Sequence, residues 1–140
     1  MTGVGRPWLA MTSVTIGAPD PRALADFYSR LLGWPVTAAE PPRPGQPAED
    51  GWAQIRPPTG EAGPTLNFEF EPDFTTPTWP SRPGEQQIQQ HLDIAVHDLE
   101  AAAAWAISCG GRLHDHQPQD HNRVMLDPAG HPFCLYLIPG

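Results

Sequence analysis

Two stretches of the chain repeat the same pattern of residues, and this repeat constrains the fold more than any other feature. The segment SVTIGAPDPRALADFYSRLLG, beginning at Ser13, matches HLDIAVHDLEAAAAWAISCGG, beginning at His91, and the match pairs Asp20 with Asp98. A second match relates TLNFEFEP to PFCLYLIP near the C-terminal end. The spacing between the two matches differs because the first copy carries an extra proline-rich loop, PPRPGQPAEDG. The sequence therefore predicts two copies of one structural unit.

Each copy predicts the order strand, helix and three further strands. Alternating apolar residues in VTI and LDIAV indicate half-buried strands. Asp20 and Asp98 are suited to cap the helices that follow, and Pro21 fits the first helical position. Phe27 and Trp105 occupy matching positions in the two copies and are expected to lie on the buried side of each helix. The predicted architecture is βαβββ, twice.

Charge and composition exclude several classes of partner. Sixteen acidic residues oppose eight arginines, with no lysine, for a formal net charge of −8. Nucleic acids and anionic membranes attract basic surfaces, so neither is an expected partner. The sequence shows no apolar leader and no run of apolar residues long enough to cross a bilayer. With two cysteines and no secretory signal, we expect a cytoplasmic protein with reduced thiols.

The repeat resembles the vicinal oxygen chelate superfamily, which includes glyoxalase I, extradiol dioxygenases, fosfomycin-modifying enzymes and bleomycin-resistance proteins. The resemblance is carried by VTIGAPDPRALADFYSRLLGW, HLDIAVHDLEAAAAWAISCGGRL and DPAGHPFCLYL, and is greatest to small glyoxalase-like proteins. It implies an α+β fold with two tandem modules, residues 9–73 and 87–139, joined by a proline-rich linker, residues 74–86. In such a fold the two modules form one curved mixed sheet, a cup, with the helices outside.

The resemblance also implies where a divalent metal would bind, on the first and last strands of each module. The corresponding positions in this sequence are Ser13, Asn67, His91 and Cys134, of which only His91 is a usual ligand for that site. We therefore expect no metal and no other cofactor. If a metal is present, the expected ligands are His91, Cys134 and Glu69, since Glu69 shares a strand face with Asn67.

Strand alternation predicts which side chains line the cup. If the apolar residues of each strand face the helices, the residues between them face inward. The expected ligand-binding residues are Ser13, Trp52, Gln54, Arg56, Asn67, Asp93, Cys134 and Tyr136. His91 is expected at the centre with Glu69 in reach, as a candidate acid–base pair. His114, His116 and His121 are expected in a polar loop at the rim.

Three functions are compatible with these residues, and they leave open whether the protein is an enzyme. The first is metal-independent binding of an aromatic or carbonyl-containing small molecule in the cup between the modules. The second is a metal-dependent lyase, isomerase or dioxygenase with an altered ligand set. The third is a metal-free acid–base enzyme using His91 and Glu69. We also expect a homodimer, because Trp8, Trp34 and Trp79 lie in loops or tails where a monomer would expose them.

Overall fold

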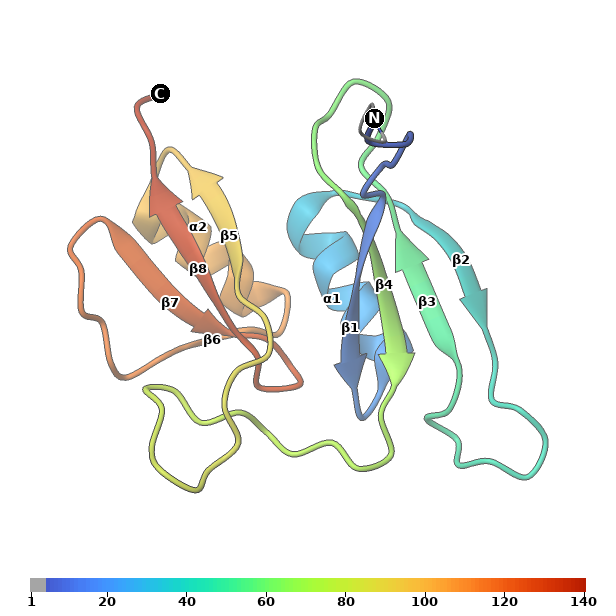
Figure 1. Ribbon diagram of the computed structural model, residues 1–140. Helices are drawn as coiled ribbons and strands as arrows, with labels where there is room; N and C mark the ends of the chain where they lie inside the picture. The colour runs from blue at the N-terminus through green and yellow to red at the C-terminus, as the bar shows by residue number, and fades with distance from the viewer. Residues whose placement is uncertain (1–4) are drawn as a thin grey trace.

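The computed structural model describes residues 5–140 and confirms the two βαβββ modules (Figure 1). The first module consists of β1 (Ser13–Ala18), α1 (Pro21–Leu32), β2 (Val36–Glu40), β3 (Trp52–Ile55) and β4 (Thr65–Phe70). The second module consists of β5 (Leu92–Val96), α2 (Leu99–Ser108), β6 (Arg112–Leu113), β7 (Asn122–Leu126) and β8 (Pro132–Leu137). The elements follow the same order in both modules.

The two helices begin in the same way, as the sequence predicted. The Asp20 side chain accepts a hydrogen bond from the backbone N–H of Ala23 at 3.1 Å. The Asp98 side chain accepts one from Ala101 at 3.0 Å, so each helix has an aspartate cap. Helix α1 ends at Gly33, whose φ of 71° lies in the left-handed region that glycine tolerates without strain.

Each module forms its own four-stranded mixed sheet. The strand orders are β1-β4-β3-β2 and β5-β8-β7-β6, with the first strand of each module parallel to its last and the other pairs antiparallel. Alternate residues on these strands are buried against the helices, including Ile16 and Phe68 at 0% exposure and Leu135 at 1%. The predicted alternation is therefore present, and it leaves the other face of each sheet, its free face, away from the helices.

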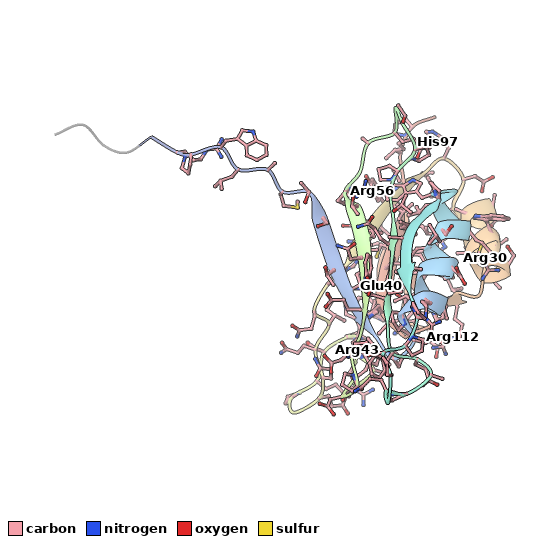
Figure 2. All side chains as sticks on the ribbon, turned by 90° about the vertical axis from the view of Figure 1, so that its right-hand side faces the viewer. Arg30, Glu40, Arg43, Arg56, His97 and Arg112 are labelled. Atoms are coloured by element: carbon pink, nitrogen blue, oxygen red, sulfur yellow. The ribbon has the colours of Figure 1, made fainter. Side chains whose placement is uncertain are left out.

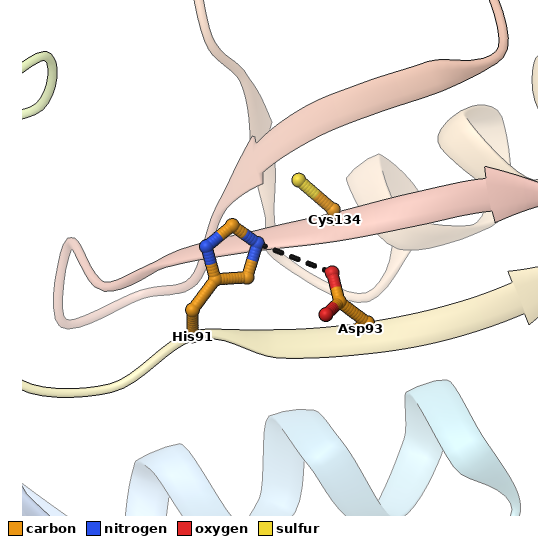
Figure 3. Close-up of side chains that lie close together, drawn as sticks. All are labelled: His91, Asp93 and Cys134. Atoms are coloured by element: carbon orange, nitrogen blue, oxygen red, sulfur yellow. Dashed lines mark ion pairs between the residues drawn. The ribbon is translucent and has the colours of Figure 1, made fainter.

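The expectation of one continuous curved sheet requires correction, because the chain forms two separate sheets. Figure 1 shows α1 lying between β5 and β1, and Figure 3 shows the same helix beside β5. In this position α1 packs against both modules. The ring centroids of Phe27 and Tyr28 each lie 5.9 Å from that of Phe133 on β8. Both modules consequently share one hydrophobic core.

Helix α2 also differs from expectation, because Trp105 does not belong to the core. Its side chain is 53% exposed, and its indole N–H donates to the backbone oxygen of Leu31 at 3.1 Å. Ala106 is fully buried, and Ala102 and Ala103 are half-buried against the core. These small residues form the inner side of α2, which leaves the large indole on the outer side, bridging to α1.

A buried hydrogen-bond network joins the modules. The Tyr28 hydroxyl, on α1, donates to the carboxylate of Asp127 at 2.8 Å, and both residues are 0% exposed. Asp127 also accepts from the backbone N–H groups of Ala129 and His131, in the turn between β7 and β8. His131 in turn contacts the backbone oxygen of Gly17 through Nε2 at 2.8 Å. Burial is the main cause that raises the pKa of Asp127 above its ordinary value of 3.8.

We expect Tyr28→Phe to lower the free energy of unfolding by about 1–3 kcal/mol at neutral pH, because a buried carboxylate loses its side-chain donor. With a raised pKa in the folded state, the Asp127 carboxyl favours folding most below 3.8, and this contribution disappears as the pH rises through the raised value. The loss in Tyr28→Phe should therefore shrink below pH 3.8, where the carboxyl group is neutral. Urea denaturation of the wild type and of Tyr28→Phe, at neutral pH and below pH 3.8, measures this effect. Tyr136→Phe, which changes an exposed tyrosine, is the control and should leave stability unchanged.

Candidate functional site

Three side chains with metal-binding and proton-transfer chemistry meet on the second module (Figure 3). His91 immediately precedes β5, and Asp93 is the second residue of that strand. Cys134, on β8, is the direct cross-strand partner of Asp93. His91 Nε2 lies 3.3 Å from a carboxylate oxygen of Asp93. One potential ligand atom from each of the three residues lies within 4.8 Å of the other two.

The electrostatics of this cluster keep the thiol in its protonated form. Cys134 is only 5% exposed, and burial raises the pKa of its thiol, with the nearby charge of Asp93 adding to the shift. A protonated thiol is a weak nucleophile, so the arrangement does not favour catalysis by a Cys134 thiolate. The side chains of His91 and Asp93 are 34% and 64% exposed, so both are accessible to a ligand.

A second group of predicted residues lies on the free face of the first sheet. Trp52 on β3 is the cross-strand partner of Glu69 on β4. Both line a cavity of about 390 Å³ with Glu40, Pro41, Arg43, Asp50, Gly51 and Phe70. One wall of this cavity belongs to the extra loop of the first module. Arg43 binds Asp50 there through Nη2 at 2.8 Å, and the hydrogen bonds from Arg43 lower the pKa of Asp50 to about 2.

Two further residues that were predicted to bind the ligand lie on the same sheet and form a hydrogen bond with each other. The Gln54 side chain donates to the Asn67 side chain at 2.9 Å and accepts from the Thr37 hydroxyl at 3.0 Å. Ser13, at the start of β1, is exposed. Arg56 follows the end of β3 and is exposed away from Arg43, as Figure 2 shows. Its charge therefore lies outside the cavity that contains Trp52.

The structure places the predicted residues in two groups, not in one. The second-sheet group consists of His91, Asp93, Cys134 and Tyr136, and the first-sheet group consists of Trp52, Gln54, Asn67 and Glu69. Asp93, and not Glu69, is the carboxylate beside His91. The two groups are separate because α1 lies between β5 and β1. The alternation of residues along a strand predicts which face a side chain is on, but not how the two modules pack.

The tryptophans outside the two groups differ in exposure, and one of them contacts two histidines of the loop that follows β6. Trp79 packs against His114 and His116, with ring centroids 5.1 and 5.5 Å apart. Trp34 and Trp79 are half-buried, contrary to expectation, whereas Trp8 is 87% exposed as expected. His131 was not singled out from the sequence. The one feature of the sequence that could have drawn attention to His131 is its position directly after the tight turn DPAG.

Two βαβββ modules with polar residues on their free faces define a protein of the vicinal oxygen chelate type. The chain belongs to the glyoxalase-like domain family, whose family model matches residues 13–136. No curated protein matches the sequence. Among the described residues, no helix combines the length and the apolar character needed to cross a membrane.

Solved structures support the same fold. A glyoxalase family protein from Enterococcus faecalis is 22% identical with a TM-score of 0.62, over 91% of this chain and 96% of that one. TnmS3, an antibiotic binding protein from Streptomyces sp. CB03234, is 18% identical with a TM-score of 0.57, over 96% and 100% of the two chains. The fosfomycin resistance protein FosX from Mesorhizobium loti is 10% identical with a TM-score of 0.61, over 91% and 90%. At these identities the likeness concerns the fold.

Proposed function

We propose that the protein binds an aromatic or carbonyl-containing small molecule on the free faces of its sheets, without using a metal. The observation that carries this proposal is the composition of the two groups of residues. Trp52 supplies a flat apolar surface beside Glu69, and His91 and Asp93 supply exposed hydrogen-bonding atoms. A flat apolar wall with a few placed polar groups is typical of small-molecule sites.

A second copy of the chain completes this site. The strands β1 and β5 each lie at the end of their sheet, with one edge that pairs with no strand in the described chain. Residues 5–12 extend away from the body (Figure 2), and they expose Trp8, Leu9 and Met11 at 87%, 66% and 80%. Such apolar exposure favours association. In the proposed homodimer, Trp52 and Glu69 of one copy approach His91 and Asp93 of the other.

The similar proteins indicate which ligands to test first. TnmS3 is an antibiotic binding protein, and FosX is a fosfomycin resistance protein. Another protein with this fold, from Albidiferax ferrireducens T118, is described as a glyoxalase/bleomycin resistance protein. We therefore propose antibiotics and related natural products as the ligand class for this chain.

In a thermal-shift screen of bleomycin and of aromatic and carbonyl-containing natural products, we expect at least one compound to raise the Tm, because ligands stabilise the state they bind. His91→Ala and Trp52→Ala should each abolish the shift while keeping the Tm of the free protein, since neither residue is fully buried. Glu100→Ala, on the exposed side of α2, is the matched control and should keep the shift. A shift that survives in both His91→Ala and Trp52→Ala would contradict the proposed site.

A second candidate function is supported by the His91–Asp93–Cys134 cluster. An imidazole, a carboxylate and a thiolate are ligands that zinc accepts, and these three residues would hold the ion. A bound metal would polarise a substrate carbonyl. His91 and Asp93 would then orient the substrate, whereas Cys134 must first lose the proton that burial favours.

Elemental analysis of protein purified without chelator or added metal separates the two candidates. The metal-independent proposal predicts much less than one Zn, Mn, Ni or Fe per chain. A near-stoichiometric metal that disappears in His91→Ala would instead establish the metal-dependent function. Glu100→Gln is the control, because Glu100 is an exposed carboxylate on α2, outside both groups of site residues, and its substitution should not alter a metal at this cluster.

For the homodimer we expect light scattering after size-exclusion chromatography to give twice the chain mass of 15.3 kDa at micromolar concentration. The triple substitution Trp8→Ser, Leu9→Ser and Met11→Ser should weaken the dimer, because it removes the exposed apolar side chains of the extended segment. Ile107→Ser, which removes an exposed apolar residue on α2, should not. A wild-type mass of 15.3 kDa would refute the dimer.

A further inference from the structure

A row of three side chains crosses the free face of the first sheet. Trp52 on β3 is the direct cross-strand partner of Glu40 on β2 and of Glu69 on β4. Residues paired in this way project from the same face of a sheet, with Cβ atoms about 4.5–5.5 Å apart. All three residues line the cavity of about 390 Å³ on this face. The indole of Trp52 therefore has a carboxylate on each side within one cavity.

The charges of these two carboxylates are not balanced by the described chain. Within residues 5–140, neither Glu40 nor Glu69 forms an ion pair with an arginine or a histidine. Arg43 also lines the cavity, but its Nε and Nη2 both donate to the Asp50 carboxylate, at 3.0 and 2.8 Å. The pKa of Asp50 is lowered to about 2, so this pair stays ionised at neutral pH and its two charges cancel. The cavity consequently has a net negative charge beside an aromatic ring.

The arrangement suits an organic cation better than a metal ion. A metal ion needs several ligand atoms within about 2.0–2.6 Å of one point. In the part of the chain that the structure describes, Glu40 and Glu69 belong to no group of three metal-ligating side chains, and Trp52 lies between them in the row. The face of an indole attracts an ammonium group that lies within about 6 Å of the ring centre. An ammonium group held by Trp52 also lies close to both carboxylates.

We propose that this cavity binds an amine that carries an aromatic ring, with its ammonium group over Trp52 and paired with Glu40 and Glu69. The inference rests on the proposed ligand site and adds the charge of its ligand. Pro41 and Phe70, in the same lining, supply apolar surface for the ring of the ligand. A neutral molecule gains the apolar contacts without the charge interactions, and an anion is repelled by the carboxylates.

Isothermal titration calorimetry on the full chain with three matched phenols tests this inference. Tyramine, tyrosol and 4-hydroxyphenylacetate share one ring and differ at the end of the side chain, which is an ammonium, a hydroxyl and a carboxylate at neutral pH. We expect saturable binding of tyramine, about tenfold weaker binding of tyrosol, and no binding of 4-hydroxyphenylacetate at the same concentrations. The factor corresponds to the loss of one cation–π contact and two exposed charge pairs.

Two double variants locate the charge preference. Glu40→Gln combined with Glu69→Gln should abolish the preference for tyramine over tyrosol, because it neutralises both carboxylates and keeps the size of the side chains. Asp26→Asn combined with Glu100→Gln is the matched control. It removes the same charge from exposed residues of the two helices, outside the cavity, and should keep the preference.

The charge preference and the binding of aromatic molecules can fail separately. Equal affinity for tyramine and tyrosol would overturn the ammonium assignment and leave the proposed site for aromatic ligands in place. A preference that survives in the double variant of Glu40 and Glu69 would also overturn it, since the cation would then be held elsewhere. The absence of saturable tyramine binding to the wild type would overturn it too, whereas the proposed function is decided by the thermal-shift screen.

Discussion

The packing of α1 against both modules is the interaction on which the rest of the structure depends. A four-stranded sheet with one short helix buries little apolar surface by itself, and small units of this kind are only marginally stable. Phe27 and Tyr28 extend the core of the first module to Phe133 in the second. Arg30 adds a hydrogen bond to the backbone oxygen of Cys109 at the end of α2. The same packing sets the free faces of the two sheets apart.

The local elements could be predicted from the sequence because their causes are local. Asp20 and Asp98 cap their helices through bonds that span three residues. Period-two alternation of apolar residues identified the strands and the residues on each face. His91 and Asp93 could be placed side by side for the same reason, since residues two apart share a strand face.

The arrangement of the modules could not be predicted in this way. It depends on contacts between distant residues, such as the hydrogen bond from Tyr28 to Asp127, 99 positions later in the chain. The expectation that Glu69 lies within reach of His91 depends on how the two modules pack, and α1 lies between β5 and β1. Trp105 is a second example of a position that depends on distant contacts. It matches Phe27 in the repeat, but alanines form the inner side of α2 and Trp105 lies on the outer side.

The loop between β2 and β3 spans residues 41–51 and is longer than the corresponding loop of the second module, residues 114–121. Arg43 and Asp50 hold it closed through two side-chain hydrogen bonds and one from the Arg43 backbone. A duplicated unit offers two equivalent faces, and a molecule lying across them has two equivalent orientations. A walled cavity on one face removes that equivalence. The duplication thus provides two similar faces, and one loop makes them different. The two ends of an asymmetric bound molecule would then have chemically different surroundings.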